Sequence, residues 1–177
     1  MIRQRLAARL NLVLAAALTV EMQVEAALLP VDTEARALVH VLVAVLGLAF
    51  ALRSRLPLAS LVAAQVVFVV AQADRAVPEQ LYVPLFLILF LNLSAAMHVD
   101  GRRFWVVPAI TFLGGSISIL TDDYPGGGAE DLVWLAVIYT GLTAAIGRLL
   151  GNRVALQSAL RAKADRVEAE RREARER

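Results

Sequence analysis

The first 151 residues of the chain contain six long apolar runs separated by short polar connections. A helix needs about 20 apolar residues to cross the hydrocarbon core of a bilayer, and each run approaches that length. The pattern therefore predicts an all-α membrane protein whose region 1–151 is a bundle of six transmembrane helices. The predicted spans are Leu10–Leu29, Ala35–Leu52, Leu56–Ala73, Leu81–Met97, Phe104–Thr121 and Leu132–Leu150.

The pattern changes at Asn152, where the chain becomes highly charged. Residues 152–177 contain no Gly and no Pro, and they hold eight of the chain's 18 basic residues. Ala, Leu, Arg and Glu dominate this stretch and favour a helix. Leu160, Val167 and Ala174 recur every seven residues, which is the spacing of a coiled coil. We therefore expect residues 152–177 to form a cytoplasmic helix that begins a parallel coiled coil between two copies of the chain.

Polar residues weaken this predicted seam, because Lys163 and Glu170 fall on one of its candidate core lines. The alternatives are a solvated single helix and an Arg-rich segment that lies against anionic lipid. Small residues precede the tail at intervals of four, at Thr143, Gly147 and Gly151. Because small residues let helices approach closely in lipid, these three indicate either a dimer seam that leads into the tail or packing within the six-helix bundle.

The distribution of basic residues predicts the orientation of the bundle. Cytoplasmic segments of membrane proteins are enriched in Lys and Arg. One alternating set of segments holds nine arginines, and the other set holds two. The first set is Arg3, Arg5, Arg9, Arg53, Arg55, Arg102, Arg103, Arg148 and Arg153, and the second is Arg36 and Arg75. We therefore expect a multi-pass membrane protein with both termini in the cytoplasm.

Composition limits the chemistry that the chain can carry. The sequence is 59% hydrophobic and has no Cys, so it has no disulfide, thiolate metal site or reactive thiol. Two histidines leave little from which to build a transition-metal site. The sequence contains no nucleotide-binding or hydrolytic motif. We expect no enzyme activity, no cofactor and no direct nucleic-acid binding within these 177 residues.

Four ionisable residues fall in the outer halves of the first two predicted spans. Glu21 and Glu25 share one face of the first helix, and Arg36 and His40 share one face of the second. Counting 1.5 Å per residue from the connecting loop places Glu25 and His40 at similar depth. A contact of Glu25 with His40 or Arg36 would form either a sensor of pH, a cation or a cationic ligand, or a polar contact that holds the hairpin together.

The predicted outer loop DDYPGGGAED carries four carboxylates, on Asp122, Asp123, Glu130 and Asp131. Hard divalent cations prefer oxygen ligands, so one hypothesis is weak cation binding at this loop. Its spacing does not match an EF-hand, and the alternative is a flexible acidic turn.

Six short-looped spans, the turn RSRLPLA and the terminal stretch LRAKADRVEAERREARER together resemble the sensor region of actinobacterial histidine kinases of the DesK-like class. The resemblance implies a dimerisation and phosphoacceptor domain beyond Arg177, then a kinase domain that uses ATP and Mg. It also implies a response regulator as partner and a bacterial cytoplasmic membrane as the location. Neither His40 nor His98 lies in a phosphoacceptor motif, so the present residues would be the non-enzymatic input part of such a kinase.

The resemblance therefore predicts the membrane-embedded sensor domain of a dimeric two-component sensor histidine kinase. Its stimulus would arise in the membrane or envelope, with membrane lipids as partners. Two alternatives remain. One is a small six-span transporter or channel subunit that uses Glu21, Glu25 and His40 as a relay. The other is a non-enzymatic membrane scaffold that recruits a partner through its tail.

Overall fold

The computed structural model describes residues 2–28, 33–73, 82–121 and 129–176, and almost all of them are helical. No strand occurs among these residues, so the all-α prediction is confirmed for them. The α-helices are α1 (Ile2–Leu28), α2 (Thr33–Leu52), α3 (Pro57–Ala73), α4 (Tyr82–His98), α5 (Val106–Thr121), α6 (Ala129–Trp134) and α7 (Thr143–Glu176). A 3₁₀ turn, η1 (Gly101–Trp105), precedes α5, and a π-helical segment, η2 (Leu135–Leu142), joins α6 to α7.

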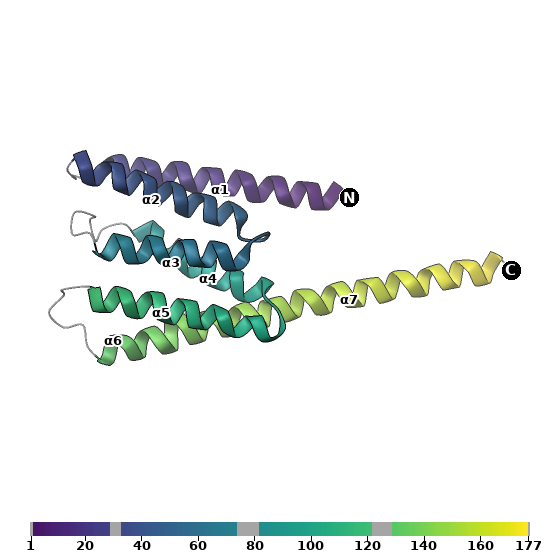
Figure 1. Ribbon diagram of the computed structural model, residues 1–177. Coiled ribbons are helices and arrows are strands. Elements are labelled where there is room, and N and C mark those ends of the chain that lie inside the picture. Colours follow the sequence, from purple (N-terminus) through teal and green to yellow (C-terminus); the bar gives the residue numbers. More distant parts are fainter. Residues whose placement is uncertain (1, 29–32, 74–81, 122–128, 177) are drawn as a thin grey trace.

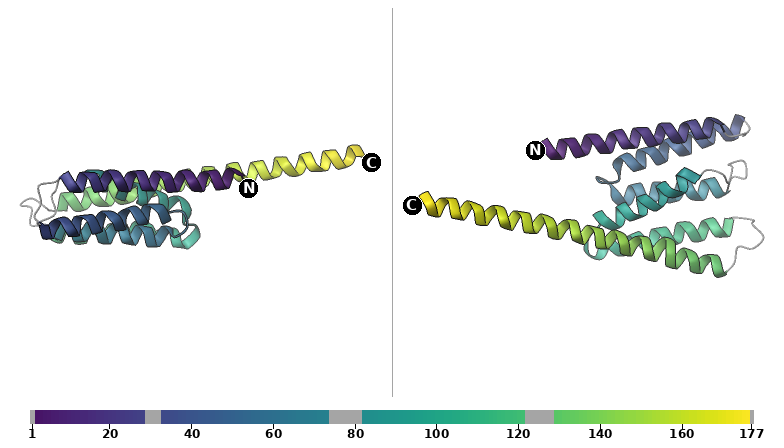
Figure 2. Two further views of the ribbon diagram at one scale, coloured as in Figure 1. Left: turned by 90° about the horizontal axis from the view of Figure 1, so that it is seen from above. Right: turned by 180° about the vertical axis from the view of Figure 1, so that it is seen from behind.

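The helices pack as an antiparallel bundle, because short connections return the chain beside the helix it has just left (Figure 1). Helix α1 packs on α2, α2 on α3, and α3 on both α4 and α5. Helix α4 packs on α7, and α5 packs on η2. The amino terminus and the outgoing half of α7 lie at the same end of the bundle, as the two views of Figure 2 also show. That end also carries the α2–α3 turn and η1.

Three helices of the described chain are long and apolar enough to cross a membrane. They are Arg9–Leu28, Ala35–Leu52 and the continuous helix Leu132–Arg175. Helix α3 has only 17 residues, which at 1.5 Å each give about 26 Å, less than the hydrocarbon core of about 30 Å. Each of the six apolar runs is helical, but the number of spans stays a prediction.

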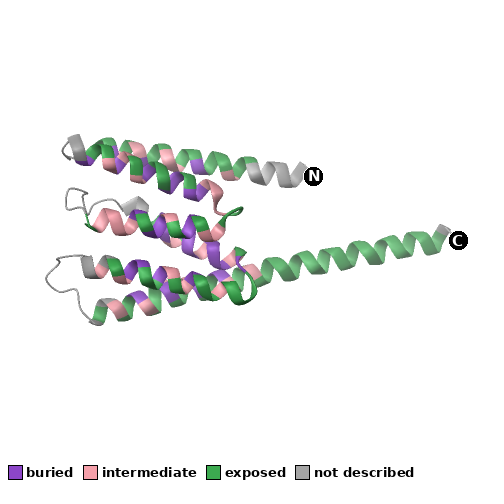
Figure 3. Cartoon of the chain, viewed as in Figure 1, coloured by how far each residue is buried: buried purple, intermediate pink, exposed green. Residues whose placement is uncertain are grey.

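The distribution of side chains is that of a protein surrounded by lipid. Apolar side chains cover the outside of the bundle: Val13 is 66% exposed, Phe86 68% and Val137 60%. Polar side chains lie inside, where Gln65 and Asn92 are almost completely buried. Figure 3 shows buried residues along the helix contacts and an exposed outgoing half of α7. An apolar exterior of this extent would be unfavourable in water, which supports a membrane protein.

The core consists of two adjoining clusters. The first joins α1, α2, α3 and α4 and contains Met22, Val39, Ala64 and Leu91. The second lies nearer the η1 end and contains Leu61 and Val107. Both are built mainly from aliphatic side chains.

The segment η2 interrupts the last long helix with eight residues of π-helix. A Cβ on Gly115 of α5 would stand too close to Cδ1 of Leu135 in η2. The glycine therefore allows η2 and α5 to approach closely. Thr143 donates a hydrogen bond from its hydroxyl to the Tyr139 carbonyl. The buried Thr140 hydroxyl has no hydrogen-bond partner among the described residues. Such π segments within α-helices are frequent at functional sites.

Candidate functional site

His40 of α2 pairs with Gln23 of α1 across the first hairpin. The His40 ring nitrogen Nδ1 lies 2.5 Å from Gln23 Oε1. Because an amide oxygen only accepts, Nδ1 carries the hydrogen of this bond. Gln23 Nε2 donates in return to the His40 backbone carbonyl at 3.0 Å. The two residues therefore form a closed double contact that ties α1 to α2.

The predicted Glu25–His40 pair does not form, and helix geometry explains why. Met22 and Ala26 are fully buried against α2. At about 100° per residue, Gln23 follows this buried stripe on one side, whereas Glu25 lies on its other flank. One Glu25 carboxylate oxygen is buried without a hydrogen-bond partner among the described residues. The Glu25 side chain therefore does not point toward His40, and the predicted pairing of these two residues was wrong.

The other ionisable residues that were predicted as sites do not take part in the His40–Gln23 contact. Glu21 and Arg36 are exposed, and Glu130 is exposed in α6, where Asp131 also lies. Asp122 and Asp123 fall outside the described residues. Within the described ranges, no group of three His, Asp or Glu side chains is placed to hold a metal ion. Cation binding at the acidic loop stays a hypothesis.

Arg53, at the end of α2, joins three helices at the opposite end of the hairpin. Its guanidinium donates to Asn11 Oδ1 of α1 and, at 2.7 Å, to the Phe50 carbonyl. It also lies over two aromatic rings, 3.7 Å from the centroid of Phe50 and 5.4 Å from that of Phe90 in α4. Burial lowers the pKa of the Arg53 guanidinium, which nonetheless stays charged at neutral pH. This contact was not predicted from the sequence.

Three buried polar side chains meet where α3, α4 and α5 come together. Asn92 Oδ1 accepts from Thr111 Oγ1 at 3.0 Å and from Gln65 Nε2 at 3.4 Å. Gly114 of α5 leaves room for the Gln65 side chain. Because Gln65 and Thr111 both donate to Asn92, this junction is a polar contact that holds the three helices together.

Helix α7 has a buried face that packs on α4. A Cβ on Gly147 would stand 2.5 Å from Ala96 Cβ and 2.7 Å from the Leu93 carbonyl oxygen. A Cβ on Gly151 would stand 2.7 Å from the Met97 carbonyl oxygen. Both glycines therefore serve packing within the chain, which was one of the two alternatives for them.

The opposite face of α7 carries a stripe of exposed apolar side chains. We call it the α7 stripe. It comprises Leu142 at the end of η2, followed by Ile146, Leu149, Leu156, Leu160 and Val167 of α7, which are 38–65% exposed. Their spacings of three, four or seven residues keep them within about 80° on a helix, and Gly147 and Gly151 lie about 140–180° away from Leu142. Thr143 is half-buried between these two faces. Ala174 continues the stripe and is exposed.

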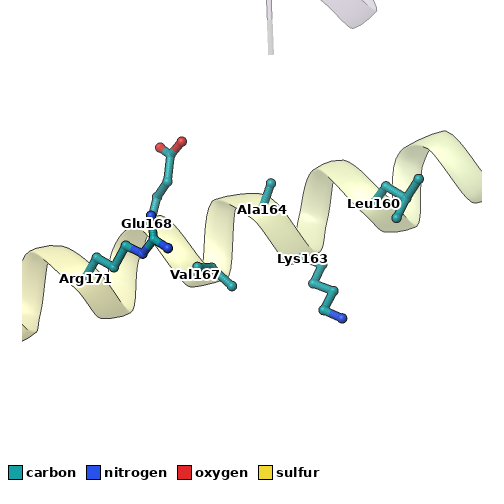
Figure 4. A pocket seen from close by; sticks show the side chains of 6 residues that line it. All are labelled: Leu160, Lys163, Ala164, Val167, Glu168 and Arg171. Carbon is teal, nitrogen blue, oxygen red and sulfur yellow. The ribbon is translucent and has the colours of Figure 1, made fainter.

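The predicted dimer seam therefore needs correction. Gly147 and Gly151 on one side, and Leu160 and Val167 on the other, lie on nearly opposite faces of one helix and cannot share an interface. Figure 4 shows the outer part of the stripe, where Leu160 and Val167 lie among Lys163, Glu168 and Arg171. Arg153 and Arg171 fall within the same sector and Lys163 lies at its edge, so basic residues interrupt the stripe.

An ion pair fastens α7 to the connection between α4 and η1. Arg148 Nη1 lies 2.8 Å from Asp100 Oδ1 and donates to the Val99 carbonyl at 3.2 Å. Its guanidinium also lies 5.3 Å from the centroid of the Phe104 ring. Asp100 was not singled out in the sequence, although it is the only acidic residue between α4 and α5.

Comparison with known proteins identifies no relative: no family model, no curated protein and no solved structure matches the chain significantly.

Proposed function

We propose that the chain is the membrane-embedded input domain of a two-component sensor histidine kinase, and that α7 passes the signal to a dimeric coiled coil. One observation carries this proposal. A single helix runs without a break from the bundle into a charged tail, packs on α4 through one face and leaves an apolar stripe on the other.

The buried face of α7 makes it responsive to the bundle. Close contact at Gly147 and Gly151 and the Arg148–Asp100 ion pair leave little freedom between α7 and α4. A stimulus that shifts α4 therefore shifts α7 with it. Displacements of 1–2 Å and small rotations of helices are common signalling steps.

The α7 stripe fits a second copy of the chain. Lipid accounts for the exposure of Leu142, Ile146 and Leu149 inside the apolar run. It does not account for Leu160 and Val167, which follow the last apolar run and lie among charged residues. Two parallel copies would bury the same stripe from both sides at coiled-coil spacing. Lys163 at the edge of the stripe keeps this contact weak, which suits a helix pair that changes its packing.

The rest of the proposal follows from the resemblance noted above. A phosphoacceptor and kinase portion, with its ATP and Mg, would be joined to the tail, and a response regulator would receive the phosphoryl group. The arginine-rich end of the bundle would face the cytoplasm of a bacterial cell.

Disulfide crosslinking of the Cys-free chain in native membranes tests the dimer. Single cysteines replace Leu156, Leu160 or Val167 of the stripe, and matched controls replace Ala162 or Ala169 on the opposite face. We expect crosslinking at the stripe positions and little at the controls. Equal crosslinking on both faces, or none, would contradict the proposed seam.

A phase experiment tests the signalling role separately. The chain is fused through its tail to the kinase portion of a characterised sensor kinase, and one to seven alanines are inserted after Ala162. Each residue turns the following helix by about 100°. Autophosphorylation should vary with the insertion length and return near seven residues. Output that is indifferent to the insertion length would favour a scaffold, and a fusion that transports a solute without altering output would favour a transporter.

A further inference from the structure

A pocket of about 300 Å³ opens at the end of the bundle from which the tail departs. Two turns form it. The α2–α3 turn contributes Arg55 and Leu56, and the segment from the end of α4 into η1 contributes His98, Asp100 and Arg103. The pocket therefore bridges segments that are more than 40 residues apart in the chain.

The polar lining of the pocket has an excess of positive charge. Arg55 and Arg103 are exposed, and neither guanidinium group makes an ion pair or hydrogen bond within the described part of the chain, where the hydrogen bonds of these residues are backbone ones. The single carboxylate, on Asp100, is already neutralised by Arg148 at 2.8 Å. His98 Nδ1 donates to the Ser94 carbonyl at 2.7 Å, so its other ring nitrogen has no part in that contact. Two arginines are thus left without an anion.

The remainder of the lining is apolar. Pro57, Leu58 and Val99 line the pocket, and Leu56 beside them is 53% exposed. Trp105 at the same end of the bundle is 71% exposed, and exposed tryptophans mark the membrane interface. A ligand that fits both parts has an anionic head and an apolar tail.

We propose that this pocket binds an anionic phospholipid, with Arg55 and Arg103 holding the phosphate and with Leu56 and Leu58 contacting the acyl chain. Basic pockets between membrane helices at the cytoplasmic side recognise acidic headgroups in this way. Arginine suits the role because its planar fork of donors matches phosphate oxygens. The assignment rests on the proposed membrane orientation of the arginine-rich end, and it does not depend on a kinase.

The bound lipid would stand next to the fastening of α7. Asp100 lines the pocket and pairs with Arg148, which belongs to α7. A phosphate held by Arg55 and Arg103 would place a second negative charge beside the Arg148–Asp100 ion pair. The geometry of this ion pair would change in response. The pocket would therefore make the position of α7 depend on the acidic-lipid content of the membrane. Acidic lipid is then the class of stimulus for the proposed input domain.

Native mass spectrometry of the full chain in neutral detergent tests the site. Phosphatidylglycerol and phosphatidylcholine with identical acyl chains are titrated, and the bound lipids are counted. We expect the first phosphatidylglycerol to bind more tightly than phosphatidylcholine. The double variant Arg55→Gln/Arg103→Gln should weaken its binding by roughly 30-fold, because each arginine near an anionic lipid contributes about fivefold.

The matched control is Arg102→Gln/Arg153→Gln, which removes two exposed arginines near the same end of the bundle that do not line the pocket. It should retain most of the preference. Equal losses in the two double variants would show unspecific attraction and would overturn the site. Glycerol 3-phosphate, the headgroup without acyl chains, should not compete at millimolar concentration. Competition by it would mean a phosphate site that needs no lipid.

The two proposals fail separately. Circular dichroism must show that each variant remains helical. If the lipid preference is absent while cysteines in the α7 stripe still crosslink, only the lipid site is wrong. If the preference is present and the stripe does not crosslink, the lipid site stands and the dimer fails.

Discussion

Gly147→Ala is the sharpest test of how α7 is held. The added methyl group would stand 2.5 Å from Ala96 Cβ and 2.7 Å from a backbone oxygen of Leu93. Carbon atoms in contact prefer about 3.5–4.0 Å. Neither neighbour is the flexible end of a side chain, so α7 must retreat from α4 by about 1 Å.

The expected cost follows from two opposing terms. Overpacking of this kind costs about 1–3 kcal/mol. Replacing Gly by Ala inside a helix returns up to about 1 kcal/mol of helix propensity. With the full gain in helix propensity, the net loss in unfolding free energy is about 0–2 kcal/mol, and relative to a Gly→Ala control without overpacking it is about 1–3 kcal/mol. Gly141→Ala is the control: a methyl group there would meet only the Ala136 oxygen of its own helix, at 3.2 Å.

The assay is unfolding of the purified chain in mixed micelles by increasing SDS, followed by circular dichroism. Gly147→Ala should unfold at a lower SDS fraction than the parent, and Gly141→Ala at a similar or higher fraction. Indistinguishable midpoints for Gly147→Ala and the control would refute the close α4–α7 contact. If Gly147→Ala abolished dimer crosslinking at position 160 without lowering stability, Gly147 would belong to the dimer interface and not to the contact with α4.

Two further pairs of substitutions probe the contacts of α1. Arg53→Ala should lower the unfolding free energy by about 2 kcal/mol, since it removes the bond to Asn11 and the stacking on two rings; Asn11→Ala should lose less, and a larger loss for Asn11→Ala would contradict the assignment. Gln23→Leu should cost about 1–2 kcal/mol by leaving the His40 ring unpaired, whereas Glu25→Gln should change little. The same SDS titration measures the stability of all four variants. A larger loss for Glu25→Gln than for Gln23→Leu would support the Glu25–His40 pair instead.

The helices were predictable because runs of 17–20 apolar residues leave few structural options in lipid. The sequence could also place residues in depth, since a helix rises 1.5 Å per residue. It could not give rotation about the helix axis. We therefore expected Glu25 to be the partner of His40. The residue that faces His40 is Gln23, which lies two positions earlier in α1. Rotation depends on packing between segments, which no local spacing encodes.

The α7 stripe illustrates a second limit. Within an apolar run every face of the helix is apolar, so the positions Leu142, Ile146 and Leu149 carry no readable period. Only the charged surroundings of Leu160 and Val167 made their spacing visible. The arginine pocket was hidden for a different reason, because it joins two turns that are distant in the chain.

The π segment η2 gives the last long helix a point at which one part can rotate and advance relative to the other. A π turn closes its hydrogen bonds over five residues where an α turn uses four, so it holds extra chain in reserve. Releasing one residue into α-helix would turn everything on one side by about 100° and advance it by about 1.5 Å. The motion is stepwise, because hydrogen bonds exchange whole partners. Which side of η2 rotates depends on which side is packed more tightly. While α7 is packed on α4, the rotation occurs at α6. The tail would rotate only if α6 were packed in the bundle more tightly than α7.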